Sequence, residues 1–247
     1  MLRRPVRRHR WLSAPAKQRG WSLIETMIAL AAGVILIGAS MQGLVSFHRQ
    51  FSGQQSAVAQ QQEVRLALEV LEQELLLASA ESIVSFGVEE VEFGANLHGY
   101  ATTLSAPAAS GQTTISVEEG SGWPGAKTVL LCWFEACERS ILARDGQSSM
   151  LTLTSPLSRS IPMGASVAVN NRVRYYAKKD ERGVLRFMRQ VDGGAAVLVG
   201  PIKSLRFSYW DDLGRPALLP SKVKRIVVKV EVPNSLIAAG REYTLRG

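Results

Sequence analysis

The hydrophobic residues of this chain follow three successive patterns, and the first is an unbroken apolar run. From Thr26 to Phe47 there are 22 residues without a charge. About 20 apolar residues are enough to cross the core of a bilayer as a helix. This run therefore predicts a membrane-spanning helix. Its three glycines, Gly33, Gly38 and Gly43, lower helix propensity in water, but membrane helices tolerate small residues, which allow close helix contact.

The second pattern has the period of an amphipathic helix. Apolar residues recur at steps of four and three residues, at Val64, Leu68, Leu71, Leu75 and Ala78. Such spacing places them on one face of a helix. Most polar side chains of this segment fall off that stripe: Glu63, Glu69, Glu72 and Gln73.

These two segments are expected to form one helix. No proline lies between Pro15 and Pro107. A helix from about residue 22 to about residue 79 would be roughly 85 Å long. The alternative is a break near Gly53, which would separate a membrane anchor from a soluble helix.

The third pattern, beyond residue 80, is typical of β-strands. Leu205, Phe207 and Tyr209 alternate with polar residues, and so do Ile226 and Val228. Period two with one wet face favours antiparallel strands. The expected strands are Thr128–Phe134, Met150–Thr154, Ser166–Tyr176, Val184–Gln190, Ile202–Trp210 and Lys224–Val232.

Turn residues separate the later strands, at residues 179–183, 192–194 and 211–214. Residues 94–126 are rich in Gly, Ala, Ser and Thr and suggest loops with short strands. A sheet with one apolar face needs a cover, which the amphipathic helix can supply. The expected fold class is therefore α+β. The amphipathic second half of a long N-terminal membrane-spanning helix packs on a C-terminal antiparallel β-sheet domain.

Charge is distributed unevenly along the chain. The formal net charge of the whole chain is +8. Residues 1–20 hold seven basic residues and no acid, and their removal leaves 22 basic and 21 acidic residues. A basic segment in front of an apolar span is more often a topology signal than a nucleic-acid site. The charge therefore predicts a cytoplasmic N-terminus, and no nucleic-acid partner is proposed.

The two cysteines, Cys132 and Cys137, are close together in the sequence. They favour a local disulfide in an oxidising compartment, and two reduced cytosolic thiols are the alternative. A loop this short would contribute only about 2 kcal/mol.

The junction of leader and helix carries the most specific motif, RGWSLIETM at residues 19–27. It resembles the class III signal of type IV pilins and type II secretion pseudopilins. In that family a basic leader ends in Gly, the next residue is usually Phe, and a Glu lies fifth after the cut. Here Gly20 precedes the cut, Trp21 replaces the usual Phe, and Glu25 holds the fifth place.

The resemblance implies a processing pathway. A membrane-embedded prepilin peptidase would cut the Gly20–Trp21 bond on the cytoplasmic face and methylate the new amine of Trp21. Glu25 is a lone carboxylate beside an apolar span. Placing a carboxylate within a membrane costs free energy, and such residues are usually functional. Glu25 can be compensated by the amine of Trp21, from its own chain or a neighbour, and this pairing would serve assembly. The leader is long for the family, and the proline found midway along many major pilin helices is missing.

A looser resemblance concerns the C-terminal half. Val173–Arg189, Gly200–Trp210 and Lys224–Val232 look like the corresponding strands of PilW-type minor pilins and of J-type pseudopilins of type II secretion systems. The size of the domain also favours a minor subunit. The implied partners are the prepilin peptidase, other minor pilins or pseudopilins, and the inner membrane.

Two other interpretations of the N-terminus stay open. Residues 38–40, Gly-Ala-Ser, have the small-x-small form of an ordinary secretory cleavage site, which would release the domain. An uncut anchor would give a signal-anchored periplasmic binding domain without a filament role.

Catalysis is not expected. Beyond the leader the only histidines are His48 and His98, too few with two cysteines for a zinc cluster. No nucleophile, phosphate-binding or dinucleotide motif occurs in the right context. The acid pairs at residues 89–90 and 211–212 suit turns or surfaces. Six aromatic residues suit a sheet core: Trp133, Tyr175, Tyr176, Phe207, Tyr209 and Trp210.

The sequence thus predicts four segments and a non-enzymatic role without a cofactor. Residues 1–20 are a cytoplasmic leader, 21–48 the transmembrane half of the helix, 49–80 its amphipathic half, and 81–247 a periplasmic β-rich domain. The expected function is that of a minor pilin in type IV pilus assembly or priming. A minor pseudopilin of a type II secretion system is the alternative.

Overall fold

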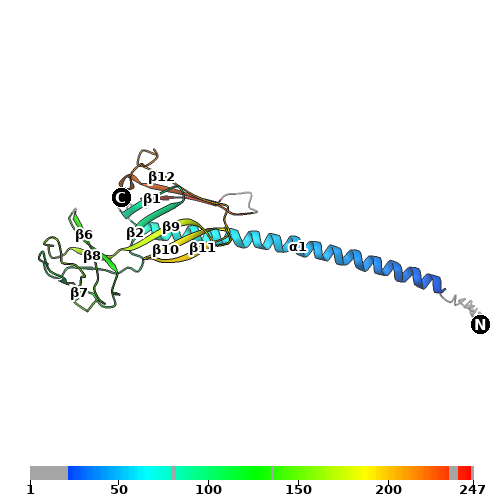
Figure 1. Ribbon diagram of the computed structural model, residues 1–247, viewed down its shortest axis with the longest axis horizontal. Helices are drawn as coiled ribbons and strands as arrows, with labels where there is room; N and C mark the ends of the chain where they lie inside the picture. The colour runs from blue at the N-terminus through cyan, green and yellow to red at the C-terminus, as the bar shows by residue number, and fades with distance from the viewer. Residues whose placement is uncertain (1–21, 79–81, 135, 234–238, 246–247) are drawn as a thin grey trace, which may run out of the picture. The chain divides into compact units, whose positions relative to one another are not determined.

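The long helix expected from the sequence is present and continuous. The computed structural model describes residues 22–78, 82–134, 136–233 and 239–245 (Figure 1). Helix α1, Leu23–Leu76, has 54 residues and no break at Gly53. The chain divides into two compact units, Met1–Gln54 and Gln55–Gly247. In the first unit every described residue belongs to α1 or directly precedes it.

The second unit contains the last part of α1 and four antiparallel sheets. The largest sheet has the strand order β1-β2-β9-β10-β11. Its strands are β1 (Ile83–Phe86), β2 (Glu90–Ala95), β9 (Asn171–Lys179), β10 (Leu185–Val191) and β11 (Gly194–Val199). A three-stranded sheet has the order β12 (Ser204–Trp210), β13 (Arg225–Glu231) and β14 (Ala239–Thr244), with a 3-10 turn η2 (Pro220–Lys222) before β13.

Between β2 and β9 the chain forms an inserted lobe, residues 96–170. It contains a four-stranded sheet, β3-β8-β5-β6, and a two-stranded sheet, β4-β7. The strands are β3 (Ala101–Thr103), β4 (Thr114–Ser116), β5 (Thr128–Trp133), β6 (Ala136–Ile141), β7 (Met150–Thr152) and β8 (Ser166–Val169). The lobe has its own buried cluster, which includes Trp123, Leu131, Leu142 and Val167. It therefore has a hydrophobic core separate from that of the other sheets.

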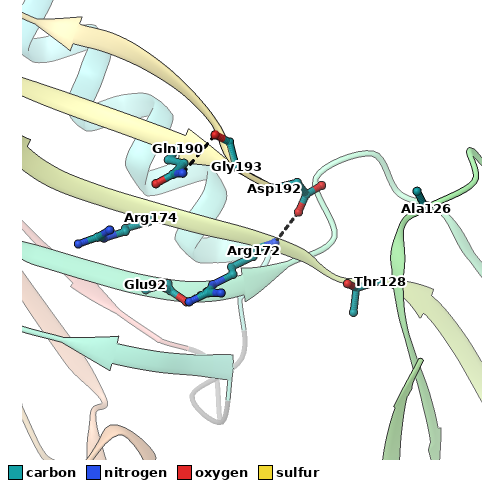
Figure 2. Close-up of a pocket in the computed structure, with 8 residues that line it drawn as sticks. All are labelled: Glu92, Ala126, Thr128, Arg172, Arg174, Gln190, Asp192 and Gly193. Atoms are coloured by element: carbon teal, nitrogen blue, oxygen red, sulfur yellow. Dashed lines mark hydrogen bonds and ion pairs between the residues drawn. The ribbon is translucent and has the colours of Figure 1, made fainter. Parts of the chain in front are cut away.

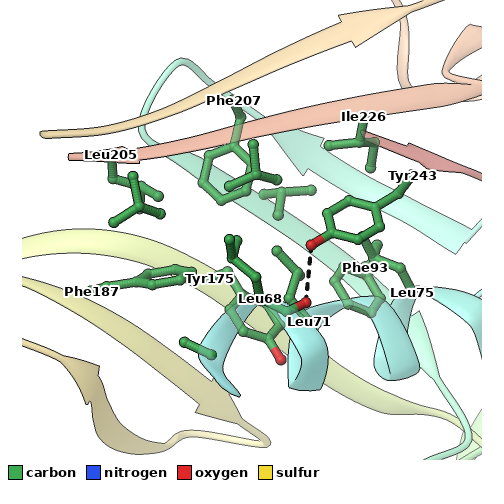
Figure 3. Packing of buried hydrophobic residues seen from close by; sticks show 14 of the residues in the cluster. Leu68, Leu71, Leu75, Phe93, Tyr175, Phe187, Leu205, Phe207, Ile226 and Tyr243 are labelled. Atoms are coloured by element: carbon green, nitrogen blue, oxygen red, sulfur yellow. Dashed lines mark hydrogen bonds between the residues drawn. The ribbon is translucent and has the colours of Figure 1, made fainter. Parts of the chain in front are cut away.

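The main core joins α1 to the five-stranded and three-stranded sheets. All five apolar residues of the predicted helical stripe are buried, each with no more than 4% of its surface exposed. Leu68, Leu71 and Leu75 meet side chains from both sheets, such as Phe93 and Phe207 (Figure 3). Complete burial of one such leucine contributes about 1.5–3 kcal/mol. Packing on the sheets thus stabilises this part of the helix.

The period-two prediction is confirmed in the three-stranded sheet. Leu205, Phe207 and Tyr209 of β12 are buried, while Arg206 and Ser208 are exposed. Ile226, Val228 and Val230 of β13 are buried too, and β12 pairs with β13 in antiparallel register.

The predicted strands need correction at two points. The stretch Ser166–Tyr176, expected as one strand, is two strands separated by Asn170 and belonging to different sheets. The backbone N–H of Asn170 donates to Thr128 O in the lobe, whereas Asn171 pairs with Ala95 of β2. The chain therefore leaves the lobe at this point. Five strands were not predicted: β1, β2, β6, β11 and β14.

Candidate functional site

The described chain begins at the site that the sequence singled out. Gly20 and Trp21 lie outside the described residues, whereas Glu25 lies in the first turn of α1. The backbone N–H of Ser22 donates to the Glu25 carboxylate at 3.0 Å, and the Glu25 N–H donates to Ser22 Oγ at 3.3 Å. This reciprocal pair is a capping box, which satisfies two otherwise unpaired N–H groups. Glu25 therefore fixes the start of the helix.

This cap was not predicted, although the sequence contains its signature. A Ser followed three residues later by Glu, directly before an apolar run, is the sequence signature of a capping box. The carboxylate accepts a hydrogen bond from the N–H of Ser22, the residue that directly follows Trp21. A negative charge at a helix N-terminus is also favoured by the helix dipole.

The apolar first part of α1 is exposed around its whole circumference. Leu23, Ile28, Ile35 and Leu44 have between 58% and 80% of their surface exposed. By length and composition this is the one helix of the described chain that is able to cross a membrane. A signal sequence near an N-terminus meets the same criterion.

Further along α1, Glu74 connects the helix to the five-stranded sheet. Its carboxylate is 7% exposed and accepts hydrogen bonds from Tyr175 Oη and from Arg189. The Arg189 Nε lies 3.0 Å from one carboxylate oxygen and 3.1 Å from the other. Burial, the hydrogen bond to Glu74 and its charge raise the pKa of Tyr175 far above its usual value. The phenol therefore stays a donor, and the buried carboxylate is fully paired.

Two contacts connect the same helix to the three-stranded sheet. Arg241 of β14 forms an ion pair with Glu72. Tyr243 Oη donates to the backbone carbonyl of Leu68 at 2.9 Å (Figure 3). Because that carbonyl lies within the helix, the bond fixes the position of the helix along the strand as well as its distance. The helix is thus held by polar contacts to both sheets.

The predicted disulfide is present in the inserted lobe. Cys132 and Cys137 face each other across the β5–β6 hairpin, with an S–S bond of 2.07 Å. Both cysteines of the chain are used, and neither is free. The bond closes the strand ends next to Phe134, whose side chain is 96% exposed.

A charged cleft of about 550 Å³ was not foreseen from the sequence. Glu92 of β2 and Arg172 and Arg174 of β9 line one side of it (Figure 2). Thr128 of the lobe and Asp192, in the turn after β10, also line the cleft. The arginines at alternate positions of β9 could have indicated this cleft, because they place two guanidinium groups on one face of a strand.

The charges of this cleft are compensated within the protein. Arg172 pairs with Glu92, and Arg174 with Glu90. Asp192 accepts from Lys127 Nζ at 2.7 Å and from the Asn171 side chain at 2.9 Å. Partial burial of Asp192 opposes its ionisation, but these donors and the Arg172 N–H hold its pKa below the usual value. The charged side chains of the cleft lining, Glu92, Arg172, Arg174 and Asp192, are thus each paired.

The other residues considered from the sequence have structural positions. His48 and His98 are exposed. Asp211 accepts the N–H groups of Leu213 and Arg215 in a turn, as predicted for that acid pair. Among the described residues no group of three or more His, Cys, Asp or Glu side chains is arranged to hold a metal ion.

The prediction for the aromatic residues is partly wrong. Tyr175, Phe207 and Tyr209 are buried in the main core. Tyr176 and Trp210 instead lie half-buried on the outer faces of their sheets, because they occupy the opposite phase of the strand alternation. The guanidinium of Arg174 lies 4.7 Å from the ring centre of Tyr176, and that of Arg225 lies 5.5 Å from the ring centre of Trp210.

Comparison with protein-family models, with curated proteins and with solved structures finds no match to this chain. Any functional assignment therefore depends on the residues themselves.

Proposed function

We propose that this chain is a minor pilin, processed by a prepilin peptidase and acting in type IV pilus assembly or priming. The observation that carries the proposal is the sequence at the junction between the basic leader and the apolar helix, together with the helix itself. Gly20 and an aromatic residue precede α1, and Glu25 lies in its first turn; α1 is a 54-residue helix that is apolar and exposed at first and buried on one face later. In this proposal the first part anchors the subunit in the inner membrane, and the domain lies in the periplasm.

The role proposed for Glu25 is compatible with the capping box. Before cleavage its carboxylate accepts the Ser22 N–H. Cleavage after Gly20 would create a positively charged amine on Trp21, next to that N–H in the chain. An ion pair in a low-dielectric environment is much stronger than in water. The proposed pairing of Glu25 with a Trp21 amine, its own or a neighbour's, would guide the subunit into register.

The first experiment tests processing. The full chain is expressed in membranes with a prepilin peptidase, and the N-terminus of the product is determined by mass spectrometry. The expected product begins at methylated Trp21, and Gly20→Val is expected to accumulate the uncut precursor. A product that begins at Met41 would establish an ordinary secretory signal. An uncut wild-type chain would favour the signal-anchored binding domain.

The second experiment separates charge from helix capping at Glu25. Glutamine also completes a capping box, so Glu25→Gln removes the charge and keeps the acceptor. Ser22→Ala is the matched control, because it removes a cap contact and keeps the carboxylate. We expect normal processing in both variants and loss of pilus output only in Glu25→Gln. Loss of one member of a buried charge pair typically costs about 3–5 kcal/mol. Normal pilus output from Glu25→Gln would reject the assembly role.

The type II secretion alternative predicts a different phenotype. If the chain is a minor pseudopilin, deletion of its gene stops the release of secreted proteins and leaves pili intact. Deletion in the native cell, with pilus and secretion output measured side by side, decides between the two systems.

A further inference from the structure

A second hollow lies on the outer face of the five-stranded sheet, where the turn between β9 and β10 meets β11. Its volume is about 460 Å³, which is within the range of ligand-binding pockets. Four of its lining residues are basic and two are acidic. The hollow therefore differs from the charged cleft in having more cations than acids.

One of the two acids is used within the turn itself. The carboxylate of Asp180 accepts the backbone N–H groups of Arg182 and Val184, each at 2.9 Å. It also pairs with the guanidinium of Arg186 at 2.8 Å. The Val184 N–H, followed by the Arg186 guanidinium, holds the pKa of Asp180 below its usual value. Asp180 therefore fixes the turn and neutralises Arg186, and it is not available to the other cations.

The three remaining cations of the hollow are Lys178, Lys179 and Arg182. All three are exposed, and their side chains form no ion pair with any residue that the structure describes. Glu181 is the second lining acid, so the hollow has a net formal charge of +2, from four basic and two acidic residues. Such a surplus favours an anionic ligand.

The sheet surface between these charged side chains is apolar. Met188 of β10 lies directly opposite Tyr176 of β9 on one side and Val197 of β11 on the other. Met188 and Val197 line the hollow, and half of the surface of Val197 is accessible. Covering this surface with an apolar group would be favourable, and a methionine adapts to the shape of such a group. The hollow thus combines an apolar floor with a cationic rim.

We propose that this hollow binds a short acidic peptide segment of a partner protein. One apolar side chain of the segment lies on Met188 and Val197, and flanking carboxylates pair with the lysines and the arginine of the rim. The cations come from the end of β9 and from the following turn, so a segment with several carboxylates reaches more of them than a single small anion does.

Two other anionic partners fit less well. Single-stranded nucleic acid binds through aromatic faces on which its bases stack. No aromatic side chain is among the described residues that line the hollow, and the guanidinium of Arg174 lies over the ring of Tyr176 at 4.7 Å. A bilayer presents a flat surface, whereas the apolar residues here lie between longer charged side chains, and Glu181 would repel anionic lipids.

The first test is a binding assay with the purified full chain in nanodiscs of a neutral lipid. The probe is a fluorescent pentapeptide with leucine between two pairs of glutamates, followed by anisotropy. We expect saturable binding with a Kd below about 1 mM that weakens as salt is added. No saturable binding, or equal binding of a probe with glutamines in place of the glutamates, would overturn the proposal. The assay needs only the purified chain, so its result does not depend on the proposed pilus function.

The second test removes the three unpaired cations together. Lys178→Gln, Lys179→Gln and Arg182→Gln should weaken binding of the acidic probe by about tenfold or more. The matched control removes two lysines and one arginine that are exposed elsewhere: Lys222→Gln, Lys229→Gln and Arg206→Gln. Urea unfolding checks that both triple variants are folded. Equal weakening by the two would show a general attraction to net charge and overturn the proposal.

The third test concerns the apolar floor and the class of ligand. Val197→Ser should weaken binding of the leucine probe and leave a probe with serine in place of leucine nearly unaffected; equal losses would overturn the proposal. Inorganic phosphate, phosphatidylglycerol vesicles and an oligothymidylate are then used as competitors. We expect none of them to displace the leucine probe at an equal concentration of negative charge. Displacement by one of them would assign the hollow to that class of anion and overturn the proposal.

Discussion

The two halves of α1 share one secondary structure and differ in what surrounds them. From Leu23 to about Phe51 the apolar side chains are exposed on every side of the helix. From Val64 to Ala78 one apolar face is buried, and the remaining surface mixes polar residues with exposed apolar ones such as Leu66 and Leu77. The second half is stabilised by packing within its own chain, whereas the apolar surface of the first half needs an environment that the chain does not supply.

This difference shows which structural conclusions the spacing of apolar residues supports. Apolar residues at helical spacing identify one face of the helix as buried, and therefore predict that this face packs on another part of the same protein. A helix that is apolar around its whole circumference has no single packing face. The lipid chains of a bilayer can surround such a helix on all sides. The predictions below ask whether the two halves differ in energy as they do in exposure.

The largest effect is expected in the buried half. Leu71→Ala removes a side chain with 0% exposure from the main core. The free energy of unfolding should fall by about 2–5 kcal/mol, because the surroundings cannot close the cavity completely. The matched control is Leu66→Ala on the same helix, where the leucine is 62% exposed and the change should be small. Urea unfolding of the full chain in detergent measures both, and equal losses would contradict the comparison.

A smaller effect is expected at the polar contact of the same half. Glu74→Gln keeps the shape of the side chain but removes the charge paired with Arg189. We expect a loss of about 1–3 kcal/mol, typical of a buried charged group left without its full partner. Glu69→Gln, at an exposed position of α1, is the control. If the two variants unfold at the same urea concentration, the Glu74 contact does not stabilise the helix against the sheet.

A change outside α1 sharpens the comparison. Cys132→Ser combined with Cys137→Ser should destabilise the lobe by about 2 kcal/mol, because the closed loop is short. The main core contains neither cysteine, so hydrogen exchange should increase in β5 and β6 and not in α1. Faster exchange in the second half of α1 would show that the lobe and the helix unfold together.

The smallest effect concerns pH and the contact between Lys127 and Asp192. The pKa of Asp192 is lower in the folded protein than in the unfolded chain. Its contribution to stability is therefore complete above the unfolded value of about 3.9 and is lost as the pH falls through the folded value. A partly exposed pair contributes about 0.2–1 kcal/mol. Asp192→Asn should lower stability by this amount at pH 7, and the difference from the wild type should shrink as the pH falls below about 3.9, measured by urea unfolding over a pH series.

Much of the fold was predictable because its signals are local. The stripe from Val64 to Ala78 and the alternation in β12 and β13 each identify a buried face directly. β11 was missed because its run of Gly and Ala has neither alternation nor β-branched residues until Val197. Its strand structure depends instead on pairing with β10.

The polar sites were less predictable because their partners are distant in sequence. The local sequence does not distinguish Glu74 from the other glutamates of the helix. Its burial depends on Tyr175 and Arg189, which come from two strands of the sheet. The charged cleft likewise requires the lobe to bring Lys127 to Asp192. The disulfide was predictable because only two cysteines are present and they lie close together.

The inserted lobe has a consequence for the order in which the chain folds. Ala95 and Asn171, which flank the lobe, are directly paired neighbours in the five-stranded sheet. To form that pair from an unfolded chain, the whole intervening segment must be closed into a loop, with an entropy cost that grows with its length. A lobe that has already collapsed around its own core brings these two residues together as a short connection. If the lobe collapses first, pairing of β2 with β9 closes a much shorter effective loop, and variants that slow that collapse should also slow the formation of the sheet.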